Sequence, residues 1–560
     1  MQNEKTTIDM KHKFNSLKKT VWLLSSVLVL ASCESDAWKD HYQYNGGGTP
    51  VKTLAETLSG NPDAEKFVQA LKNTYMFNGD KQMMLTYWEM LKESQFLTVW
   101  LPLESKVPDS IWTEALKDLT DKTKDHKKVS TQFILNHIAH FNHAVSGSTK
   151  GKIYMLSDKS YETYSDKIDA FPYLKTNIRC TNGIIHEIDG YLDYRTSIYE
   201  YLVNSPEYKN VLGDWLKKYT IEEVDAKKSV AAGINSNGEM EYVDSVMVKT
   251  SVIMKKYGLI SAEDSSYYLV LADPEVWANK YEEVKPWFTY AEYLEGSDSL
   301  QEYNTQCALL TDAFFNMNIQ KHPEDEIQST LYNRYESYDD SIPYHVYKNP
   351  SQPGGLFDTK YKACSNGRVY IWDRWPFDDS RTFNRTIKLE AENAKIEGNN
   401  LFTNPRYVTK INGQNLEKMI TVMEVYGNSK DWQATFSIDN NLKGKYNVKI
   451  VMAPNDTKKY KGNIMKYKFH PSVTYIEQKS TATLLDQYTG SGPKKKKTVF
   501  ENDVTKLDTI SIGTIDVPAC NYNLDSKLRL TIECYIYSND VQDHTEQMWI
   551  DCIMLEPVVE

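Results

Sequence analysis

Three closely spaced histidines are the first residues whose type and spacing suggest chemistry. His137, His140 and His143 fall within one short segment, and imidazole is a common metal ligand. On a helix the three side chains would fan over a wide arc, and on a strand His140 and His143 would face opposite ways. Zinc takes about four converging ligands, and no carboxylate is near in the sequence. We therefore expect no metal site here, and predict that His137 is a buried histidine that joins a strand to a helix through hydrogen bonds.

A catalytic motif would be a second indication that the protein carries out a reaction. The sequence contains no nucleophile elbow, P-loop, dinucleotide fingerprint or His-Glu-x-x-His pattern. The acidic pair Asp339-Asp340 and the run at 324–326 are typical of solvated surfaces. We expect a protein that is not an enzyme and has no catalytic residue and no cofactor. A cryptic glycoside hydrolase stays open as an alternative, because distance in the fold defines its carboxylate pair.

The N-terminus indicates where the protein resides. Lysines at 11, 13, 18 and 19 precede an apolar run at 20–31, which is too short to span a bilayer and typical of a signal peptide. The run ends in Leu30-Ala31-Ser32-Cys33, which resembles the lipobox of bacterial lipoproteins. That resemblance implies cleavage before Cys33 and lipidation of its thiol. Residues 1–32 are the predicted signal peptide, and residues 33–50, which include three glycines, form a lipidated N-terminus and flexible tether.

The residues after the lipidation site bear on which side of the membrane the protein faces. Glu34-Ser35-Asp36 resembles the export signal of surface lipoproteins in Gram-negative bacteria with glycan-uptake loci, and a plain spacer is the alternative. We expect a protein anchored by lipid in the outer membrane, on the extracellular face. The net charge of −11 argues against nucleic acid as a partner, because no broad basic field is available to neutralise phosphates.

Cysteine usage leaves the redox state open. Besides Cys33, six cysteines stand at 180, 307, 364, 520, 534 and 552, and no two are spaced as Cys-x-x-Cys. They would pair in an oxidising compartment or remain as buried free thiols.

Two similar stretches indicate a repeated fold. Residues 180–190 form a predicted strand entered through Asn182-Gly183, and residues 364–373 repeat the design with Asn366-Gly367. Apolar strands that run into proline precede both, at 96–102 and 267–274, and helices open at 54–58 and 198–202. A further helix is predicted at 308–315. At about 180 residues the repeat has the length of a domain, and the pattern predicts one fold that occurs twice.

The first copy resembles the fasciclin domain. The motifs are Phe96, Val99 and Pro102, then Leu135 with His137, and then the Asn-Gly-x-Ile-His-x-Ile-Asp-Gly type segment at 182–190. The resemblance covers residues 51–195 and implies an α+β fold, and residues 196–380 are a divergent fasciclin-like copy. Asn136 stands where the family usually has the tyrosine that precedes the central histidine, so no adhesion contact is carried over to His137.

The last segment, 385–560, has alternating short strands typical of an all-β sandwich. Residues 387–392 and 550–557 resemble the two ends of a jelly-roll carbohydrate-binding module. That resemblance implies that Glu390, Glu392 and Asp551 occupy positions that often hold a structural calcium. We expect the sandwich without a metal, because these are only three ligands and calcium takes six to eight. The predicted fold class is α+β, with two fasciclin-like domains, followed by an all-β jelly-roll sandwich.

These features favour a non-catalytic surface lipoprotein that binds glycan. Such fasciclin-like lipoproteins resemble accessory components of a TonB-dependent transporter and its lid lipoprotein, so the expected partners are the outer membrane, that transporter and polysaccharide. Aromatic residues near the end of the second copy would form a sugar platform or, as we favour, pack a large loop; these are Tyr332, Tyr335, Tyr338, Tyr344, Tyr347, Trp372 and Trp375. A cell-adhesion protein that uses its fasciclin-like domains is the alternative function.

Overall fold

The computed structural model describes residues 50–558, except 79–80, 122–125, 148, 225–229, 235–239, 245–246 and 331–344. The predicted signal peptide, Cys33 and nearly all of the tether lie outside the described residues, as do Asp339, Asp340 and the tyrosines at 332, 335, 338 and 344. The chain divides into two compact units, Met1–Arg195 and Thr196–Glu560. Among the described residues, no helix is both long enough and apolar enough to cross a membrane.

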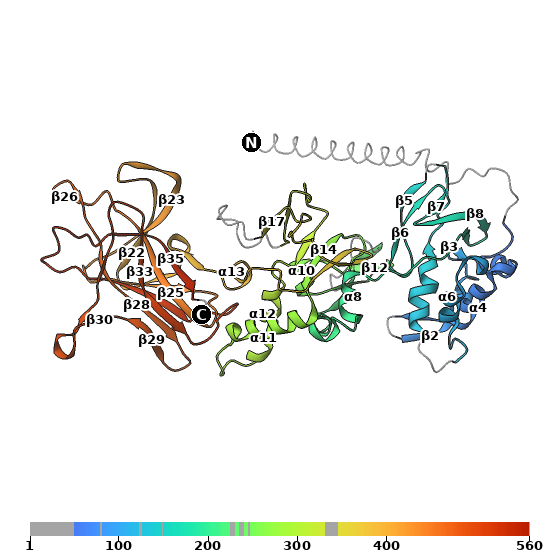
Figure 1. The fold of residues 1–560 in the computed structure, drawn as a ribbon, viewed down its shortest axis with the longest axis horizontal. Coiled ribbons are helices and arrows are strands. Elements are labelled where there is room, and N and C mark those ends of the chain that lie inside the picture. Colours follow the sequence, from blue (N-terminus) through green and yellow to red (C-terminus); the bar gives the residue numbers. More distant parts are fainter. Residues whose placement is uncertain are drawn as a thin grey trace, which may run out of the picture. The chain divides into compact units, whose positions relative to one another are not determined.

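The first unit is an α+β domain whose seven-stranded sheet has the order β4-β3-β9-β8-β7-β6-β5 (Figure 1). Its first helix begins with a capping box, in which Thr53 and Glu56 bond each other's backbone. The bounds of its elements are α3 Leu54–Ser59, α4 Glu65–Asn73, β1 Tyr75–Asn78, β2 Lys81–Thr86, α5 Tyr87–Met90, β3 Leu97–Pro102, α6 Asp109–Leu116, α7 Lys127–Val129, β4 Ile138–His140, β5 Lys150–Tyr154, β6 Ser160–Tyr164, β7 Lys167–Ile168, β8 Phe171–Cys180 and β9 Gly183–Ile188.

The second α+β domain opens the second unit. Its first helix also carries a capping box, here from Ser197 and Glu200, and its sheet has the order β15-β14-β19-β18. Its elements are α8 Ile198–Asn204, α9 Asp214–Lys218, β10 Ile221–Val224, β11 Val230–Ile234, β12 Met240–Asp244, β13 Met247–Thr250, α10 Val252–Tyr257, β14 Tyr267–Ala272, α11 Pro274–Val284, α12 Ser297–Leu309, β15 Phe314–Asn316, β16 Glu326–Gln328, β17 Val346–Lys348, β18 Tyr361–Cys364, β19 Gly367–Trp372 and α13 Asp379–Thr382.

The strands around the two Asn-Gly pairs are arranged alike. In the first domain β3 pairs in parallel with β9, beginning with Leu97 opposite Gly183. In the second domain β14 pairs in parallel with β19, beginning with Tyr267 opposite Gly367. The order β4-β3-β9-β8 thus corresponds to β15-β14-β19-β18, and the predicted repeat of one fold is present in the central strands.

The two asparagines make the same set of contacts. The Asn182 side chain accepts from the Leu54 N–H at 2.8 Å and donates to the carbonyls of Leu91 and Glu93. The Asn366 side chain accepts from the Ile198 N–H at 2.9 Å and donates to the carbonyls of Ile260 and Ala262. Each asparagine therefore fixes the first helix of its domain to the central strands, by satisfying backbone groups that would otherwise be buried without a partner.

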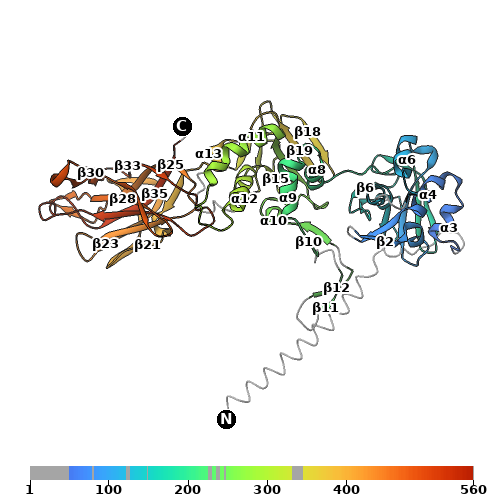
Figure 2. The same cartoon turned by 90° about the horizontal axis from the view of Figure 1, so that it is seen from below.

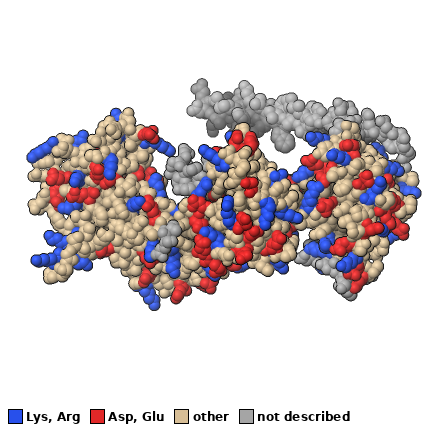
Figure 3. Space-filling view, viewed as in Figure 1, with Lys and Arg blue, Asp and Glu red and all other residues tan. Residues whose placement is uncertain are grey.

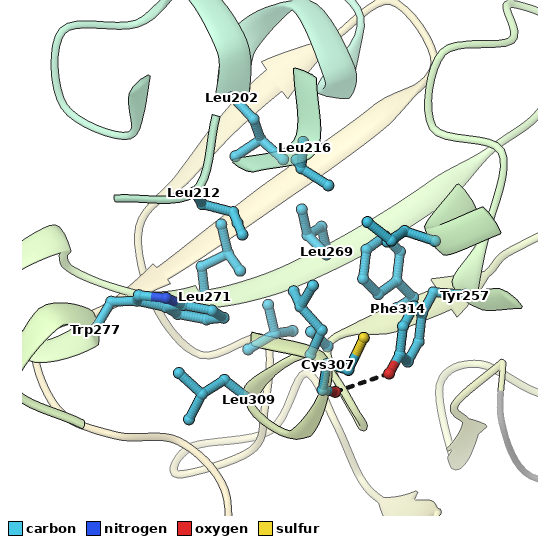
Figure 4. Packing of buried hydrophobic residues seen from close by; sticks show 14 of the residues in the cluster. Leu202, Leu212, Leu216, Tyr257, Leu269, Leu271, Trp277, Cys307, Leu309 and Phe314 are labelled. Atoms are coloured by element: carbon cyan, nitrogen blue, oxygen red, sulfur yellow. Dashed lines mark hydrogen bonds between the residues drawn. The ribbon is translucent and has the colours of Figure 1, made fainter. Parts of the chain in front are cut away.

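Apolar side chains from the helices and the central strand form the core of the second domain (Figure 4). Trp277 from α11 and Leu271 from β14 are both fully buried, and the Tyr257 hydroxyl donates to the Cys307 carbonyl at 2.7 Å. The predicted helix at 308–315 is wrong in its extent, since α12 ends at Leu309 and β15 follows. The reason is tertiary, because Phe314 pairs with Leu269 of β14 as part of the sheet.

The C-terminal part of the second unit is a β-sandwich of two six-stranded sheets, seen from two directions in Figures 1 and 2. One sheet has the order β22-β23-β35-β25-β33 with β20 paired to β35, and the other β21-β24-β34-β28-β29 with β32 paired to β28. The bounds are β20 Ile387–Glu390, β21 Ile396–Glu397, β22 Leu401–Ile411, β23 Gln414–Gly427, β24 Gln433–Ile438, β25 Gly444–Ala453, β28 Lys468–Ile476, β29 Thr481–Asp486, β32 Phe500–Glu501, β33 Asp508–Val517, β34 Leu528–Cys534 and β35 Met548–Pro557.

The sandwich and the second α+β domain share contacts within their unit. The Cys520 N–H donates to the Thr289 carbonyl at 2.7 Å, and the Lys443 N–H donates to the Trp287 carbonyl at 2.9 Å. Leu442 and Cys520 of the sandwich belong to the core of the second domain. The expected fold class, two α+β domains followed by an all-β sandwich, is confirmed.

Candidate functional site

The histidines of the first domain have structural roles. His137 is fully buried; its Nε2 accepts from the Leu192 N–H at 2.9 Å, so its Nδ1 carries the proton and donates to the Phe133 carbonyl at 2.7 Å. His140 lies beside Gln95, and His143 Nε2 lies 2.8 Å from the His140 carbonyl. The predicted burial and hydrogen bonding of His137 are confirmed, but it joins its own helical turn at Phe133 to the segment after β9 at Leu192, not to a strand. The three rings have different hydrogen-bond partners.

A fourth histidine is bonded in the same way. His186 is fully buried on β9, its Nδ1 faces the Asn177 N–H and its Nε2 lies 2.8 Å from the His143 carbonyl. Because one ring nitrogen of both His137 and His186 accepts a backbone hydrogen bond, protonation of that nitrogen would remove the bond. Burial lowers the pKa of both imidazoles to about 4.

These two pKa values predict an acid-sensitive first domain. A histidine whose folded pKa lies below its unfolded value stabilises the fold above about pH 6.5, and this stability is lost as pH falls toward 4. We expect the free energy of unfolding of this unit to fall by roughly 2 to 3 kcal/mol per histidine between pH 7 and pH 4. Urea unfolding of the first unit across that range measures it. An unfolding midpoint independent of pH would contradict the prediction.

The aromatic residues of the second domain that the structure describes pack within the domain. The Tyr347 hydroxyl donates to Asp312 Oδ2 at 2.6 Å, and burial together with this carboxylate raises the pKa of Tyr347. The Trp372 indole donates to the Leu356 carbonyl. The Trp375 ring lies 5.6 Å from the Trp277 ring. The favoured interpretation, packing rather than a sugar platform, agrees with these contacts.

Carboxylates from the two ends of the sandwich meet beside β35. Ligand atoms of Glu390, Asp551 and Cys552 all lie within 4.8 Å of one another, because β20 pairs with β35 and sets Glu390 opposite Cys552. Lys388 Nζ lies 2.6 Å from Glu390 Oε1. Glu392 Oε2 is buried and has no hydrogen-bond partner in the part of the chain that the structure describes.

The electrostatics of this acidic cluster favour a cation. Burial raises the pKa of Asp551, and the Glu390 charge adds to the effect. Burial also raises the pKa of Glu392, with contributions from Glu390 and Asp551. Both shifts arise because negative charge is held close together away from water. The oxygens of Glu390 and Asp551 suit calcium, which they would hold with backbone carbonyls or water completing its shell, whereas the Cys552 sulfur does not suit it and Glu392 is not among the residues that converge.

In contrast to the sandwich without a metal that the sequence predicts, the convergence of the Glu390 and Asp551 carboxylates leads us to expect that calcium stabilises the sandwich. An ion that binds only the folded state at a concentration of about 100 Kd adds roughly 2.7 kcal/mol to the free energy of unfolding. The midpoint of thermal unfolding of chelator-treated protein should then rise by a few degrees on adding calcium. Asp551→Asn should abolish the rise, while Asp439→Asn, an exposed position of the same sandwich, should not. Equal midpoints with calcium and with chelator would exclude the site.

The β22–β23 hairpin presents an aromatic and polar face that we call the hairpin face, made of Phe402, Asn404, Arg406, Glu424 and Tyr426. Phe402 lies opposite Tyr426 and Asn404 opposite Glu424 in the antiparallel register, so alternate residues place all five on one side. The rings of Phe402 and Tyr426 are stacked with centroids 5.2 Å apart. Phe402 is 45% exposed, and β22 is an edge strand.

The polar part of the hairpin face is held rigidly. Arg406 donates to Glu424 Oε2 from Nε at 3.0 Å and from Nη2 at 2.7 Å. Trp549 of the neighbouring strand donates to Glu424 Oε1 at 3.2 Å. The Glu424 side chain is 5% exposed, whereas that of Arg406 is 50% exposed. Arg406 therefore has further N–H donors that do not bond Glu424, and it lies on the same side of the hairpin as the stacked rings of Phe402 and Tyr426.

The hairpin face could not be identified from the sequence. The residues around Phe402 do not reveal this face, because the side chains that complete it lie on β23 and β35. The register of strand pairing brings them beside Phe402. None of the six cysteines in the described part of the chain forms a disulfide bond, and all except Cys364 are buried. Lysines, arginines and acidic residues are interspersed on the face shown in Figure 3.

Comparison with known proteins gives structural similarity only. No family model matches the chain, and no curated protein matches it. Among solved structures, it is similar to a FAS1 domain pair from the insect cell adhesion molecule Fasciclin I, with 10% identity, a TM-score of 0.16, and 51% of this chain and 90% of that one covered.

Two further structures contain carbohydrate-binding modules. The C-terminal CBM6 of LamC, a marine laminarinase from Zobellia galactanivorans, is 13% identical with a TM-score of 0.17, and 31% of this chain and 99% of that one are covered. A GH26-CBM35 β-(1,4)-mannanase from Podospora anserina is 13% identical with a TM-score of 0.18, over 32% of this chain. The chain spans 28% of the length of that mannanase.

Proposed function

We propose that the protein is a non-catalytic, lipid-anchored glycan-binding protein of the outer membrane, exposed on the cell surface. It delivers or retains glycan as an accessory of a TonB-dependent transporter and its lid lipoprotein. The hairpin face carries the glycan-binding part of this proposal, and the lipobox-like segment that ends at Cys33 carries the location.

The aromatic half of the hairpin face suits a sugar ring. The C–H faces of a pyranose stack on aromatic planes, and such contacts need a ring that is accessible and held in one orientation. Phe402 meets both conditions, since it is 45% exposed and its ring is stacked on Tyr426. A ring already fixed by its neighbour loses little conformational entropy when a ligand binds.

The polar half of the hairpin face would orient the sugar through hydrogen bonds. Sugar hydroxyls form hydrogen bonds with planar polar groups, and Arg406 and Asn404 offer donors beside the rings. Because Glu424 already orients Arg406 through two contacts to Oε2, the guanidinium is positioned before the ligand arrives. Aromatic stacking with adjacent fixed donors favours binding and supplies no paired acid and base for hydrolysis.

Removing the Phe402 ring tests the proposal. We expect Phe402→Ala to weaken the affinity of the full-length protein for its polysaccharide about tenfold, since an aromatic stacking contact is worth about 1 to 1.5 kcal/mol. Affinity electrophoresis through gels that contain xylan, mannan, galactan or laminarin measures the change. Tyr407→Ala is the matched control, because Tyr407 lies on the same strand, faces the other way and is 69% exposed.

Each outcome has a defined meaning. Retardation of the wild type that Phe402→Ala loses and Tyr407→Ala keeps supports the hairpin face. If the gels retard the wild type, Phe402→Ala and Tyr407→Ala equally, the sugar binds at a part of the protein other than the hairpin face. A wild type that no polysaccharide retards, in a strain whose cell-to-cell aggregation depends on the protein, would favour the adhesion function instead.

A further inference from the structure

One side of the four-stranded sheet in the second α+β domain is only partly covered. Leu269 of β14 and Val369 of β19 point to the opposite side, where both are fully buried in the core of the domain. Strand β18 is an edge of this sheet, and its Tyr361, on the partly covered side, is 50% exposed. Neither the sequence motifs nor the proposed glycan binding uses the side chains on this side.

Strand register brings four side chains together near this edge. We call them the tyrosine–arginine face, and they are Tyr268, Tyr361, Arg368 and Tyr370. Arg368 lies opposite Tyr268 in the parallel pairing of β14 with β19, and Tyr370 lies opposite Tyr361 in the antiparallel pairing of β18 with β19. Because side chains alternate along a strand, residues 368 and 370 share a side, and their cross-strand partners lie on it too.

The guanidinium of Arg368 is held between two aromatic rings. Its Cζ lies 4.8 Å from the centre of the Tyr361 ring and 5.3 Å from the centre of the Tyr268 ring. Its Nη1 donates to the Tyr370 hydroxyl at 3.3 Å. Contacts with ring faces orient a guanidinium and leave its other N–H donors unused.

Arg368 therefore has donors left for a ligand. Its Nε and Nη2 form no hydrogen bond within the described part of the chain, and both are accessible from the surface. No ion pair of Arg368 with another described residue is present either. The Nε and Nη2 groups lie on one edge of the guanidinium, and this edge matches the two oxygens of a carboxylate.

The surroundings of the guanidinium suit a sugar that carries this carboxylate. The exposed ring of Tyr361 can stack against the C–H face of a pyranose. The hydroxyls of Tyr268 and Tyr361 have no hydrogen-bond partner among the described residues, so sugar hydroxyls can pair with them. Ala363 lies opposite Arg368 and is exposed, and its small side chain leaves room beside the guanidinium.

From these features we infer that the tyrosine–arginine face binds an acidic sugar, namely a uronic acid residue of a polysaccharide. The carboxylate would accept hydrogen bonds from Nε and Nη2 of Arg368, and the pyranose ring would stack on Tyr361. This site lies in a different domain from the hairpin face, and it does not depend on glycan binding there.

Calorimetry on the full-length protein with acidic oligosaccharides from pectate and from alginate tests the inference. We expect at least one of them to bind, and its methyl ester, which keeps the sugar rings and loses the charge, to bind about tenfold more weakly. An oligomer of glutamate has carboxylates and no sugar ring, and it should also bind about tenfold more weakly. Absence of heat with both acidic oligosaccharides would overturn the inference, as would equally tight binding of the glutamate oligomer.

Substitutions locate the acidic sugar. Arg368→Lys keeps the positive charge and loses the planar pair of donors, so it should weaken binding about tenfold. Tyr361→Ala removes the stacking ring and should weaken binding about tenfold as well. Lys362→Gln is the matched control, because Lys362 is an exposed cation on the same strand whose side chain points to the opposite side. Its affinity should match that of the wild type.

Thermal unfolding of each variant separates lost binding from lost structure. Tyr361 is exposed at a sheet edge, so Tyr361→Ala decides the question even if Arg368→Lys does not fold. Equal weakening by Tyr361→Ala and Lys362→Gln would mean that net charge alone attracts the probe and would overturn the inference. Binding of the acidic probe that Phe402→Ala abolishes and Tyr361→Ala leaves intact would also overturn it, since the sugar would then occupy the hairpin face.

Discussion

Gly367→Ala is expected to unfold the second α+β domain under conditions in which the wild type is stable. A Cβ at this position would stand 1.8 Å from the Tyr267 carbonyl oxygen and 2.8 Å from its carbon. Both atoms belong to the backbone of β14, which pairs in parallel with β19, so no flexible side chain can move aside. The backbone φ of +149° adds strain for any residue with a side chain.

Clash and strain together should cost more than about 4 kcal/mol, a large part of the 5 to 15 kcal/mol by which domains are usually stable. Urea unfolding followed by tryptophan fluorescence measures the loss. Gly233→Ala is the matched control, because Gly233 has a similar φ of +153° and, among the described residues other than its two chain neighbours, no atom lies within 4 Å of the place where its Cβ would stand. If both variants unfold at the same urea concentration, the close approach to β14 is not what requires glycine.

Cys33→Ser is expected to release the protein from the membrane completely. Each buried CH₂ of an acyl chain contributes about 0.8 kcal/mol to membrane binding, so several chains on one residue make attachment lasting. A serine hydroxyl cannot replace the thiol as the site of lipidation. We expect the wild type in the membrane fraction after a high-salt wash, and the variant in the soluble fraction or as an unprocessed precursor.

Cys364→Ser is the control for this experiment, since Cys364 lies at a half-buried position far from the N-terminus in sequence and forms no disulfide bond with another described residue. Its fractionation should match that of the wild type. Mass spectrometry of the N-terminal peptide should find acyl groups on Cys33 of the wild type. A Cys33→Ser protein that stays in the washed membrane fraction would show that something other than this residue holds it there.

The sequence predicted the fold best where the evidence was local. Asn182-Gly183 and Asn366-Gly367 marked two equivalent turns because an Asn-Gly pair is a turn signal that can be identified within two residues. The backbone groups that the two asparagine side chains contact lie 89 to 168 residues away in the sequence, so those contacts were not predicted. The end of α12 was missed for the opposite reason. Phe314 is apolar enough for either a helix or a strand, and its pairing with Leu269 decided between them.

The candidate sites were predicted less well than the fold. Glu390 and Asp551 were singled out from opposite ends of the sandwich, and their convergence depends on β20 pairing with β35. The unpaired oxygen of Glu392 could not be foreseen, since it depends on which neighbours fill the space around it. The hairpin face was missed because the register of β22 with β23 decides which residues share a side, and because Trp549, which donates to Glu424, comes from the distant strand β35.

By itself, the sequence determined the repeated α+β plan, the β-rich C-terminal third and the lipobox-like segment at Cys33. These are set by periodicity and by short motifs, which act between residues close in the chain. Only the tertiary structure decided that Arg406 is held by Glu424 and that His137 and His186 are buried as neutral rings. Hydrogen bonding, burial and charge at these positions depend on strand register and packing, which bring together groups that the sequence keeps apart.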